Sequence, residues 1–293
     1  MTAPRAMPKV SVVIPARNEQ ERLPRQLAAL SKQRFPGPWE VIVADNGSTD
    51  RTTRIARDWR GPIPSLTVVD ASRAPGINVA RNEGVRVASA GRIVLCDADD
   101  RVHPDWLARL YAGLDHAGLV AGRLEIEAVN DPRVSALRSW RFERLRPSFG
   151  FMPSAAGANC GFRRSVFDAV GGFDETFTGG CDEIDFFWRA QLTGYELAFV
   201  EDAVVDYHFR PRAWETVRQL HTQAIQQPHL YRKFHDAGMS RPGAAAVARR
   251  WLWIMAALPL LPLSAPRRRA WLRLVATTSG RLRGSVRYRT LYL

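Results

Sequence analysis

The fold of this chain is indicated most clearly by the stretch Ile93-Val94-Leu95-Cys96-Asp97-Ala98-Asp99-Asp100. The four apolar residues predict a buried strand, and three carboxylates follow it directly. Carboxylates crowded at the end of a buried strand repel one another, so they need a cation or a hydrogen-bond network. Mg²⁺ takes carboxylate oxygens as ligands together with substrate phosphates. The stretch therefore predicts a site for metal and diphosphate, and the alternative is an acidic turn that caps a helix beginning near Pro104.

The N-terminal half of the chain alternates apolar runs with helical stripes. We expect strands over residues 10–14, 41–44, 66–69 and 93–96, and helices over residues 19–30, 55–59 and 78–88. Such alternation predicts an α/β fold with a mostly parallel sheet and helices on both faces. Ligands of such sheets bind outside the carboxyl ends of the strands. The polar clusters at residues 15–19, 45–50 and 97–100 all fall at those ends.

The second half of the chain is less regular. We expect a strand over residues 119–129, an amphipathic helix over 132–145, a loop of small residues over 147–157 and a short helix ending at Gly171-Gly172. Beyond these, the pattern predicts a helix over 182–194 with an acidic first turn and two short strands over 196–207 that meet near Asp202. The last helix of this part is expected over 212–235, kinked or broken at Pro228.

The positive charge of the chain is confined to its C-terminal part. The formal net charge is +13, yet residues 241–293 hold eleven Arg, no Lys and no acidic residue. The other 240 residues carry 31 basic and 29 acidic side chains, so that part is nearly neutral. We therefore expect two parts, a main domain over residues 8–240 and a basic, Trp- and Leu-rich helical tail over 241–293. The positive charge therefore indicates the kind of surface that the tail contacts. We expect no nucleic acid partner for the main domain.

The tail contains an apolar run over residues 251–263, flanked by arginines and tryptophans. A membrane-spanning helix needs about 20 residues, and Pro259 and Pro262 interrupt this shorter run. Tryptophan and arginine around an apolar run favour a helix that lies in the interface of an anionic membrane surface. The alternatives are a helical hairpin packed on the main domain or on a second subunit, and a nucleic acid contact.

The cysteines and the N-terminus bear on the compartment. Cys96, Cys160 and Cys181 are far apart and odd in number, which fits neither a zinc site nor a disulfide framework and favours a reducing environment. The first residues show no basic, apolar leader, so we expect no secretory signal. We expect a cytoplasmic protein, peripheral on the inner face of the cell membrane.

Seven short motifs occur in a characteristic order along the chain. They are residues 10–19 (VSVVIPARNE), 45–50 (DNGSTD), 80–84 (ARNEG), 97–99 (DAD), 157–159 (GAN), 171–174 (GGFD) and 182–185 (DEID). With them the chain resembles the family 2 glycosyltransferases, which have the GT-A fold. The resemblance implies transfer of a sugar from a UDP-, GDP- or dTDP-linked donor to an acceptor hydroxyl, with inversion at the anomeric carbon. It also implies Mg²⁺ or Mn²⁺ as cofactor and cell-surface glycan or glycolipid assembly, with an acceptor that is a lipid-linked glycan.

The resemblance also implies roles for individual residues. Asp45 would read the nucleobase, and Asp97 would lie near the ribose and diphosphate. Asp99 and His208 would hold the metal. The remaining donor-binding residues implied are Pro15, Arg17, Glu19 and Asn82.

The acidic motif at residues 182–185 is the candidate for acid–base chemistry. A carboxylate is a common general base for deprotonating an acceptor hydroxyl. The family usually has Glu-Asp where this chain has Asp182-Glu183, so Glu183 occupies the position of the base and Asp182 is the substitute. Asn159 and Asp185 would face the acceptor or the sugar. From the residues alone, these acids could instead cap a helix or favour its dipole.

Three other functions compete with sugar transfer. A nucleotidyltransferase of similar topology usually has a Gly-rich loop with basic residues after the first strand, which residues 15–19 lack. A non-catalytic nucleotide-binding module would not need the acidic motifs. A dinucleotide-binding dehydrogenase would need Gly-x-Gly-x-x-Gly after the first strand, and this chain has none there.

Overall fold

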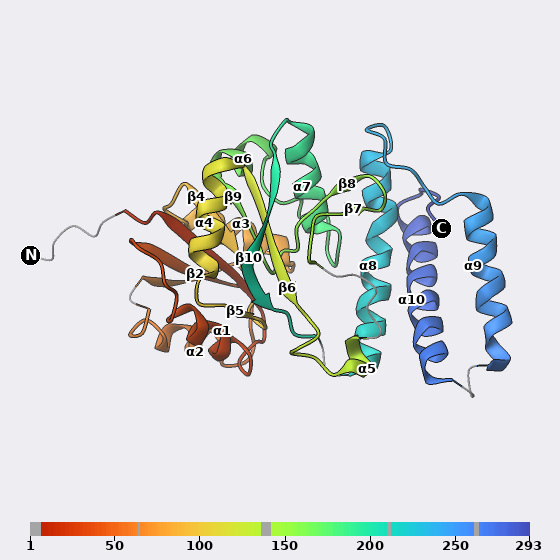
Figure 1. Cartoon of the computed structure of the whole chain (residues 1–293), viewed down its shortest axis with the longest axis horizontal. Helices are drawn as coiled ribbons and strands as arrows, with labels where there is room; N and C mark the ends of the chain where they lie inside the picture. The colour runs from red at the N-terminus through yellow and green to blue at the C-terminus, as the bar shows by residue number, and fades with distance from the viewer. Residues whose placement is uncertain (1–6, 64, 136–141, 210–211, 261–263) are drawn as a thin grey trace, which may run out of the picture.

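A central sheet of eight strands organises the computed structural model, which describes residues 7–63, 65–135, 142–209, 212–260 and 264–293. The strand order is β3-β2-β1-β4-β9-β6-β10-β5 (Figure 1). The bounds are β1 Val10–Ala16, β2 Trp39–Asp45, β3 Leu66–Asp70, β4 Arg92–Leu95, β5 Arg101–Val102, β6 Leu119–Glu125, β9 Cys160–Arg163 and β10 Leu197–Asp206. Neighbours are parallel except at β9, which runs against β4 and β6, and at β5, which runs against β10. The predicted mostly parallel sheet is confirmed.

Helices cover both faces of the sheet, as the continuous apolar strands require. Along β1, Val12 and Ile14 pack on one face with α1 (Leu23–Leu30), α2 (Thr52–Asp58) and α4 (Trp106–His116). Val13 points to the other face and packs with α3 (Ile77–Val87), α6 (Arg164–Val170) and α7 (Asp182–Leu192). Side chains alternate between faces along a strand, so one run of apolar residues fills two cores.

The irregular second half differs from the sequence prediction in three places. The helix expected over 132–145 is only α5 (Pro132–Ser135); residues 136–141 lie outside the described part, and 142–145 are not helical. The reason is that Phe142 runs beside β6, where its carbonyl accepts the Leu124 N–H at 3.1 Å. The expected loop over 147–157 contains a short hairpin, β7 (Pro147–Ser148) with β8 (Met152–Pro153). The two strands expected over 196–207 are one strand, β10, whose register with β6 shifts between Val200 and Val204.

Three helices stand side by side beyond one edge of the sheet, and two of them belong to the predicted tail (Figure 1). They are α8 (Ala213–Phe234), which continues through Pro228, α9 (Ala244–Ala257) and α10 (Ala265–Arg287); η1 (Leu258–Leu260) follows α9. A Cβ on Gly280 or Gly284 of α10 would lie 2.4 or 2.3 Å from a backbone oxygen of α8, so only glycine allows this close packing. Within the described ranges no helix combines the length and apolarity needed to cross a bilayer.

Candidate active site

A cleft of about 330 Å³ opens at the carboxyl ends of β1, β2 and β4. Its walls come from the end of β1 and the loop that follows it, from Asn46 after β2, from the start of α3, from the loop after β4, from residues 207–209 after β10 and from Gln219 of α8. Six predicted site residues line it, namely Pro15, Arg17, Glu19, Asp97, Asp99 and His208. The fold thus brings to one cleft residues that are far apart in the sequence.

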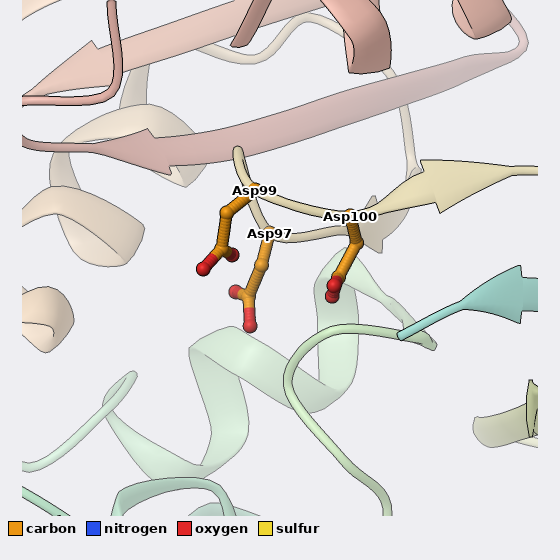
Figure 2. Close-up of side chains that lie close together, drawn as sticks. All are labelled: Asp97, Asp99 and Asp100. Carbon is orange, nitrogen blue, oxygen red and sulfur yellow. The ribbon is translucent and has the colours of Figure 1, made fainter. Parts of the chain in front are cut away.

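A cluster of three carboxylates lies at this cleft, and two of them, Asp97 and Asp99, line it. Oxygens of Asp97, Asp99 and Asp100 lie within 4.8 Å of one another, and their side chains extend to the same side of the loop after β4 (Figure 2). Burial raises the pKa of Asp97 to about 7, although Arg81 opposes the shift; burial and the neighbouring Asp99 and Asp97 raise the pKa of Asp100 well above its usual range. Asp97 Oδ1 and Asp100 Oδ2 are buried without a hydrogen-bond partner in the described part of the chain. Such oxygens suit a hard divalent cation.

The alternative interpretation of the cluster, a cap for the helix near Pro104, finds no support. That helix is α4, which begins at Trp106 after Asp105, and no side chain caps it in the described structure. The loop is held instead from α1. Gln26 donates to the Asp97 carbonyl at 3.0 Å and accepts the Val102 N–H at 3.0 Å, while Arg25 donates to the Asp99 carbonyl at 2.7 Å.

Arg22 supplies a positive charge to the carboxylate cluster. Its Nη1 lies 3.2 Å from Asp99 Oδ2, and its Nε lies 3.0 Å from Glu19 Oε2. Both acids line the cleft, so the guanidinium joins the loop after β1 to the loop after β4. Arg22 is partly exposed and can leave Asp99 at small cost, because exposed ion pairs contribute little.

His208 is attached to the carboxylate cluster through its backbone. Its N–H donates to Asp100 Oδ1 at 2.8 Å, and its Nδ1 lies 3.0 Å from the Asp206 carbonyl oxygen. Burial lowers the pKa of His208, with Arg25 adding to the shift, which favours the neutral ring. A neutral ring that donates from Nδ1 keeps a lone pair on Nε2, the form that binds metals. His208 lines the cleft but does not belong to the group within 4.8 Å.

A second charged group adjoins the carboxylate cluster. The buried Arg81 of α3 pairs through Nη1 with Asp182 Oδ2, at the first residue of α7, and lies 3.3 Å from Asn78 Oδ1. Burial and the charge of Asp182 raise the pKa of Glu183 to about 8, and Arg81 opposes this shift. Asp97 feels the charges of both Arg81 and Asp182, so the two groups form one electrostatic site. An ionised carboxylate with a pKa near 8 is a strong general base.

Two predicted site asparagines lie away from the cleft lining and bind backbone instead. Asn82 accepts the Phe173 N–H and donates to the Phe173 carbonyl, both at 2.9 Å. Asn159 is fully buried; it accepts from Trp106 Nε1 at 2.8 Å and donates to the carbonyls of Arg123 and Ala203 at 2.9 and 2.8 Å. Both side chains hold loops together, and the ligand contacts expected of them stay predictions.

Four predicted acids, Asp45, Asp182, Glu183 and Asp185, also lie outside the cleft lining. Asp185 is fully buried between α7 and α8, where it pairs with Arg189 at 2.8 Å and with Lys233 at 2.6 Å. This ion pairing ties the two helices together. Asp45 accepts the Ser48 N–H at 3.2 Å through Oδ2, while its Oδ1 is buried and finds no partner among the described residues. Its role toward a nucleobase stays a prediction.

The structure adds site residues that the sequence prediction did not select. Arg81 lies on a helix where its pairing with Asp182 has no sequence signal, since the two are 101 positions apart. Asn46 donates to the carbonyls of Ala71 and Ala74 at 2.6 and 2.8 Å and so fixes the loop beside the cleft. The position of Asn46 in the polar cluster after β2 could have identified it as a site residue from the sequence. Gln219 comes from α8, and nothing in the sequence marks it.

Comparisons with known proteins agree with this fold. Residues 11–171 match the family model described as glycosyl transferase family 2, and residues 92–283 match one described as glycosyl transferase family group 2. Glycosyltransferase AglE of Haloferax volcanii is 31% identical over 209 residues, which cover 70% of this chain and 68% of AglE. Probable glycosyltransferase YdaM of Bacillus subtilis is 25% identical over 225 residues; the match covers 71% of this chain but only 52% of YdaM.

A solved structure resembles the chain over nearly its whole length. Mannosyltransferase PcManGT from Pyrobaculum calidifontis, solved in complex with GDP-Man and Mn²⁺, superposes with a TM-score of 0.66 at 23% identity. The match covers 94% of this chain and 88% of PcManGT. The likeness confirms the predicted GT-A fold. The chain belongs to glycosyl transferase family 2 and is a glycosyltransferase.

Proposed function

We propose that the chain transfers a sugar from a nucleoside diphosphate sugar to an acceptor hydroxyl, with inversion at the anomeric carbon. The observation that carries this proposal is the cluster of Asp97, Asp99 and Asp100 at the cleft, with the Arg81–Asp182–Glu183 group beside the cluster. Such a site has carboxylates for a cation and, next to them, a carboxylate for a base. That is the pair of functions that displacement of a diphosphate by a hydroxyl requires.

The donor would lie along the cleft with its diphosphate at the carboxylate cluster. Asp97, Asp99 and His208 would hold Mg²⁺ or Mn²⁺, and the buried Asp97 oxygen that has no partner among the described residues fits such a role. When bound, the cation would neutralise the charge that develops on the leaving diphosphate. The Mn²⁺ and GDP-Man held by PcManGT support this assignment. Pro15, Arg17 and Glu19 would surround the nucleoside, since they line the same cleft.

Glu183 would act as the general base. The acceptor oxygen forms its bond to the anomeric carbon as the bond from that carbon to the diphosphate oxygen breaks, and the acceptor proton passes to the Glu183 carboxylate. Asp182 is held by Arg81 in the buried ion pair. Burial, together with the charge of Asp182, raises the pKa of Glu183, which makes the ionised form of Glu183 more basic. Glu183 is therefore favoured over Asp182 for this role.

The acceptor and the location are part of the same proposal. We propose an acceptor carried on a lipid, in cell-surface glycan or glycolipid assembly at the inner face of the cell membrane. The basic composition of residues 241–293 supports a membrane surface nearby. Helix α10 of this basic segment packs on α8, and α8 supplies Gln219 to the cleft. A membrane surface at the basic segment would therefore lie close to the cleft in which the donor binds.

The test is release of nucleoside diphosphate from a panel of UDP-, GDP- and dTDP-sugars, with and without chelator. We expect release that needs Mg²⁺ or Mn²⁺, and we expect Asp99→Ala to lose it at least about a hundredfold. Asp202→Ala is the matched control, because Asp202 is exposed on β10 and is not one of the residues that line the cleft. Turnover that persists in chelator would contradict the metal assignment. Consumption of triphosphates with release of pyrophosphate would favour a nucleotidyltransferase.

A further inference from the structure

Helix α9 exposes an apolar face that nothing in the described chain covers. Its buried side is formed by Ile254 and Ala257, and the Ile254 carbonyl accepts from Trp271 Nε1 of α10 at 2.9 Å. The opposite side carries large apolar side chains that are strongly exposed: Leu252 70%, Met255 61%, Trp251 43% and Trp253 41%. A soluble surface rarely gathers so many large apolar side chains on one short helix.

The exposed residues form one continuous strip along the helix. Ala245, Ala248, Leu252 and Met255 are three or four positions apart and all exposed, so they share one side of α9. Trp251 and Trp253 flank this strip. A helix of 14 residues is about 21 Å long, too short to cross a bilayer but long enough to lie in its surface. Figure 1 places α9 on the outside of the three-helix group, with α10 between it and α8.

The surroundings of the strip are positively charged. Residues 241–293 hold eleven arginines and no acidic residue, and Arg249, Arg267 and Arg268 are exposed. Arg249 lies on α9 itself, and the other two lie at the start of α10 beyond the end of α9. An apolar strip with tryptophans at its flanks, one arginine on the same helix and two arginines beyond its end matches the layers of an anionic lipid surface. A second copy of the same face would bring like charges together.

We propose that the outer face of α9, with Arg249, Arg267 and Arg268, docks the protein on an anionic lipid bilayer. The helix lies in the interface, with Leu252 and Met255 in the acyl boundary and the arginines at the headgroup phosphates. The inference deepens the proposed function, on which it rests for the lipid-linked acceptor. The helix α8 joins the two surfaces, because it packs on α10 and supplies Gln219 to the cleft.

The first experiment sediments the full chain with lipid vesicles and without donor. We expect binding to phosphatidylcholine vesicles that hold about 30% phosphatidylglycerol, and at least about tenfold weaker binding to phosphatidylcholine alone. Added salt should weaken the binding to the anionic vesicles, because screening reduces the attraction between arginine and headgroup. A full chain that stays in the supernatant at every anionic fraction would overturn the proposal.

Two pairs of variants assign the binding to this surface. Leu252→Ser with Met255→Ser should weaken binding by about tenfold or more, as should Arg267→Ala with Arg268→Ala. The matched controls are Leu192→Ser, a side chain 50% exposed at the end of α7, and Arg54→Ala with Arg57→Ala on exposed positions of α2. All the substituted side chains are exposed, so the fold is retained, and circular dichroism checks this. Controls that lose binding as the variants do, or variants that bind as the unaltered chain does, would overturn the assignment.

Two further readouts separate membrane docking from self-association, and the docking proposal from the proposed function. A change from dimer to monomer in light scattering for Leu252→Ser with Met255→Ser, without a change in vesicle binding, would assign the face to a second copy. Release of nucleoside diphosphate is measured in parallel without vesicles. If the full chain does not bind vesicles but still releases nucleoside diphosphate in the presence of metal, only the docking proposal is overturned. If it binds vesicles but releases no nucleoside diphosphate, only the proposed function is overturned.

Discussion

The Arg81 guanidinium and the Asp182 carboxylate form a buried ion pair that joins α3 to α7 beside the carboxylate cluster. The guanidinium also lies over the Phe173 ring, 5.4 Å from its centroid. Gly157 makes room for it, because a Cβ there would lie 2.1 Å from Arg81 Nη2. The acidic neighbours Asp182, Glu183 and Asp97 raise the pKa of Arg81, so its charge is permanent. The Arg81 guanidinium is thus a positive charge to which Asp182, Glu183 and Asp97 all respond.

Removal of the Arg81 guanidinium should destabilise the fold strongly. Arg81→Met leaves Asp182 buried without its partner, and we expect a loss of about 3–5 kcal/mol in the free energy of unfolding. Urea unfolding followed by circular dichroism measures it. Arg57→Met on exposed α2 is the control and should change stability by less than about 0.5 kcal/mol.

A double variant tests the same ion pair independently. Arg81→Met combined with Asp182→Asn removes both charges, so it should recover part of the stability that Arg81→Met loses. If the losses of the two single variants simply add, Arg81 and Asp182 do not interact as the structure indicates.

Replacement of the proposed base should separate binding from turnover. Glu183→Gln keeps the shape of the side chain but cannot take a proton, so we expect kcat to fall by about 10²–10⁴. The donor affinity, measured by calorimetry with metal present, should stay within about twofold. Asp182→Asn would instead disturb the ion pair with Arg81 and lower stability. A Glu183→Gln protein that retains full kcat would assign the base elsewhere.

The raised pKa of Glu183 predicts how activity and stability depend on pH. Only the ionised form accepts a proton, so kcat/KM should rise about tenfold per pH unit up to a pKa near 8, and Glu183→Gln should flatten that limb. In the unfolded chain the same group titrates near 4.5. Between these values the folded state holds the proton that the unfolded state has lost, so this contribution to stability falls as pH rises through the window.

Thermal unfolding across that pH range checks the sign of this linkage. The Glu183→Gln protein should lose less stability than the unaltered chain between about pH 5 and pH 8. A steeper decline in the variant would show that the folded state does not raise the pKa of Glu183.

The ion pair between Arg22 and Asp99 predicts competition with a metal. A cation that binds Asp99 Oδ2 competes with the guanidinium, whose Nη1 lies 3.2 Å from that oxygen. Arg22→Gln should therefore tighten Mn²⁺ binding in the absence of donor by about two- to fivefold, the range expected for an exposed pair. Calorimetry with Mn²⁺ measures this, and Arg54→Gln on exposed α2 is the control. Weaker Mn²⁺ binding in Arg22→Gln would mean that Arg22 supports the metal site.

The sequence predicts the parts of the fold and site that follow from short-range patterns. The strands β1, β2 and β4 are apolar because both of their faces are buried, and their ends place Asp97, Asp99 and residues 15–19 in one cleft. Pairings between distant segments leave no such pattern. The contact of Phe142 with β6 and the ion pair of Arg81 arise only when the chain has folded. A buried asparagine that binds backbone also looks, in the sequence, like one that binds a ligand.

Asn159 is such a buried asparagine, and its substitution distinguishes a structural role from a ligand-binding role. The register of β10 with β6 shifts between Val200 and Val204, and Asn159 donates to the Ala203 carbonyl inside this break and to the Arg123 carbonyl opposite it. It also accepts from Trp106 Nε1. Asn159→Ala removes all three bonds in the core, so we expect a loss of about 2–4 kcal/mol in the free energy of unfolding, measured in urea. The KM for donor and for acceptor should change little in the folded fraction. A large increase in either KM with unchanged stability would restore Asn159 as a ligand-binding residue.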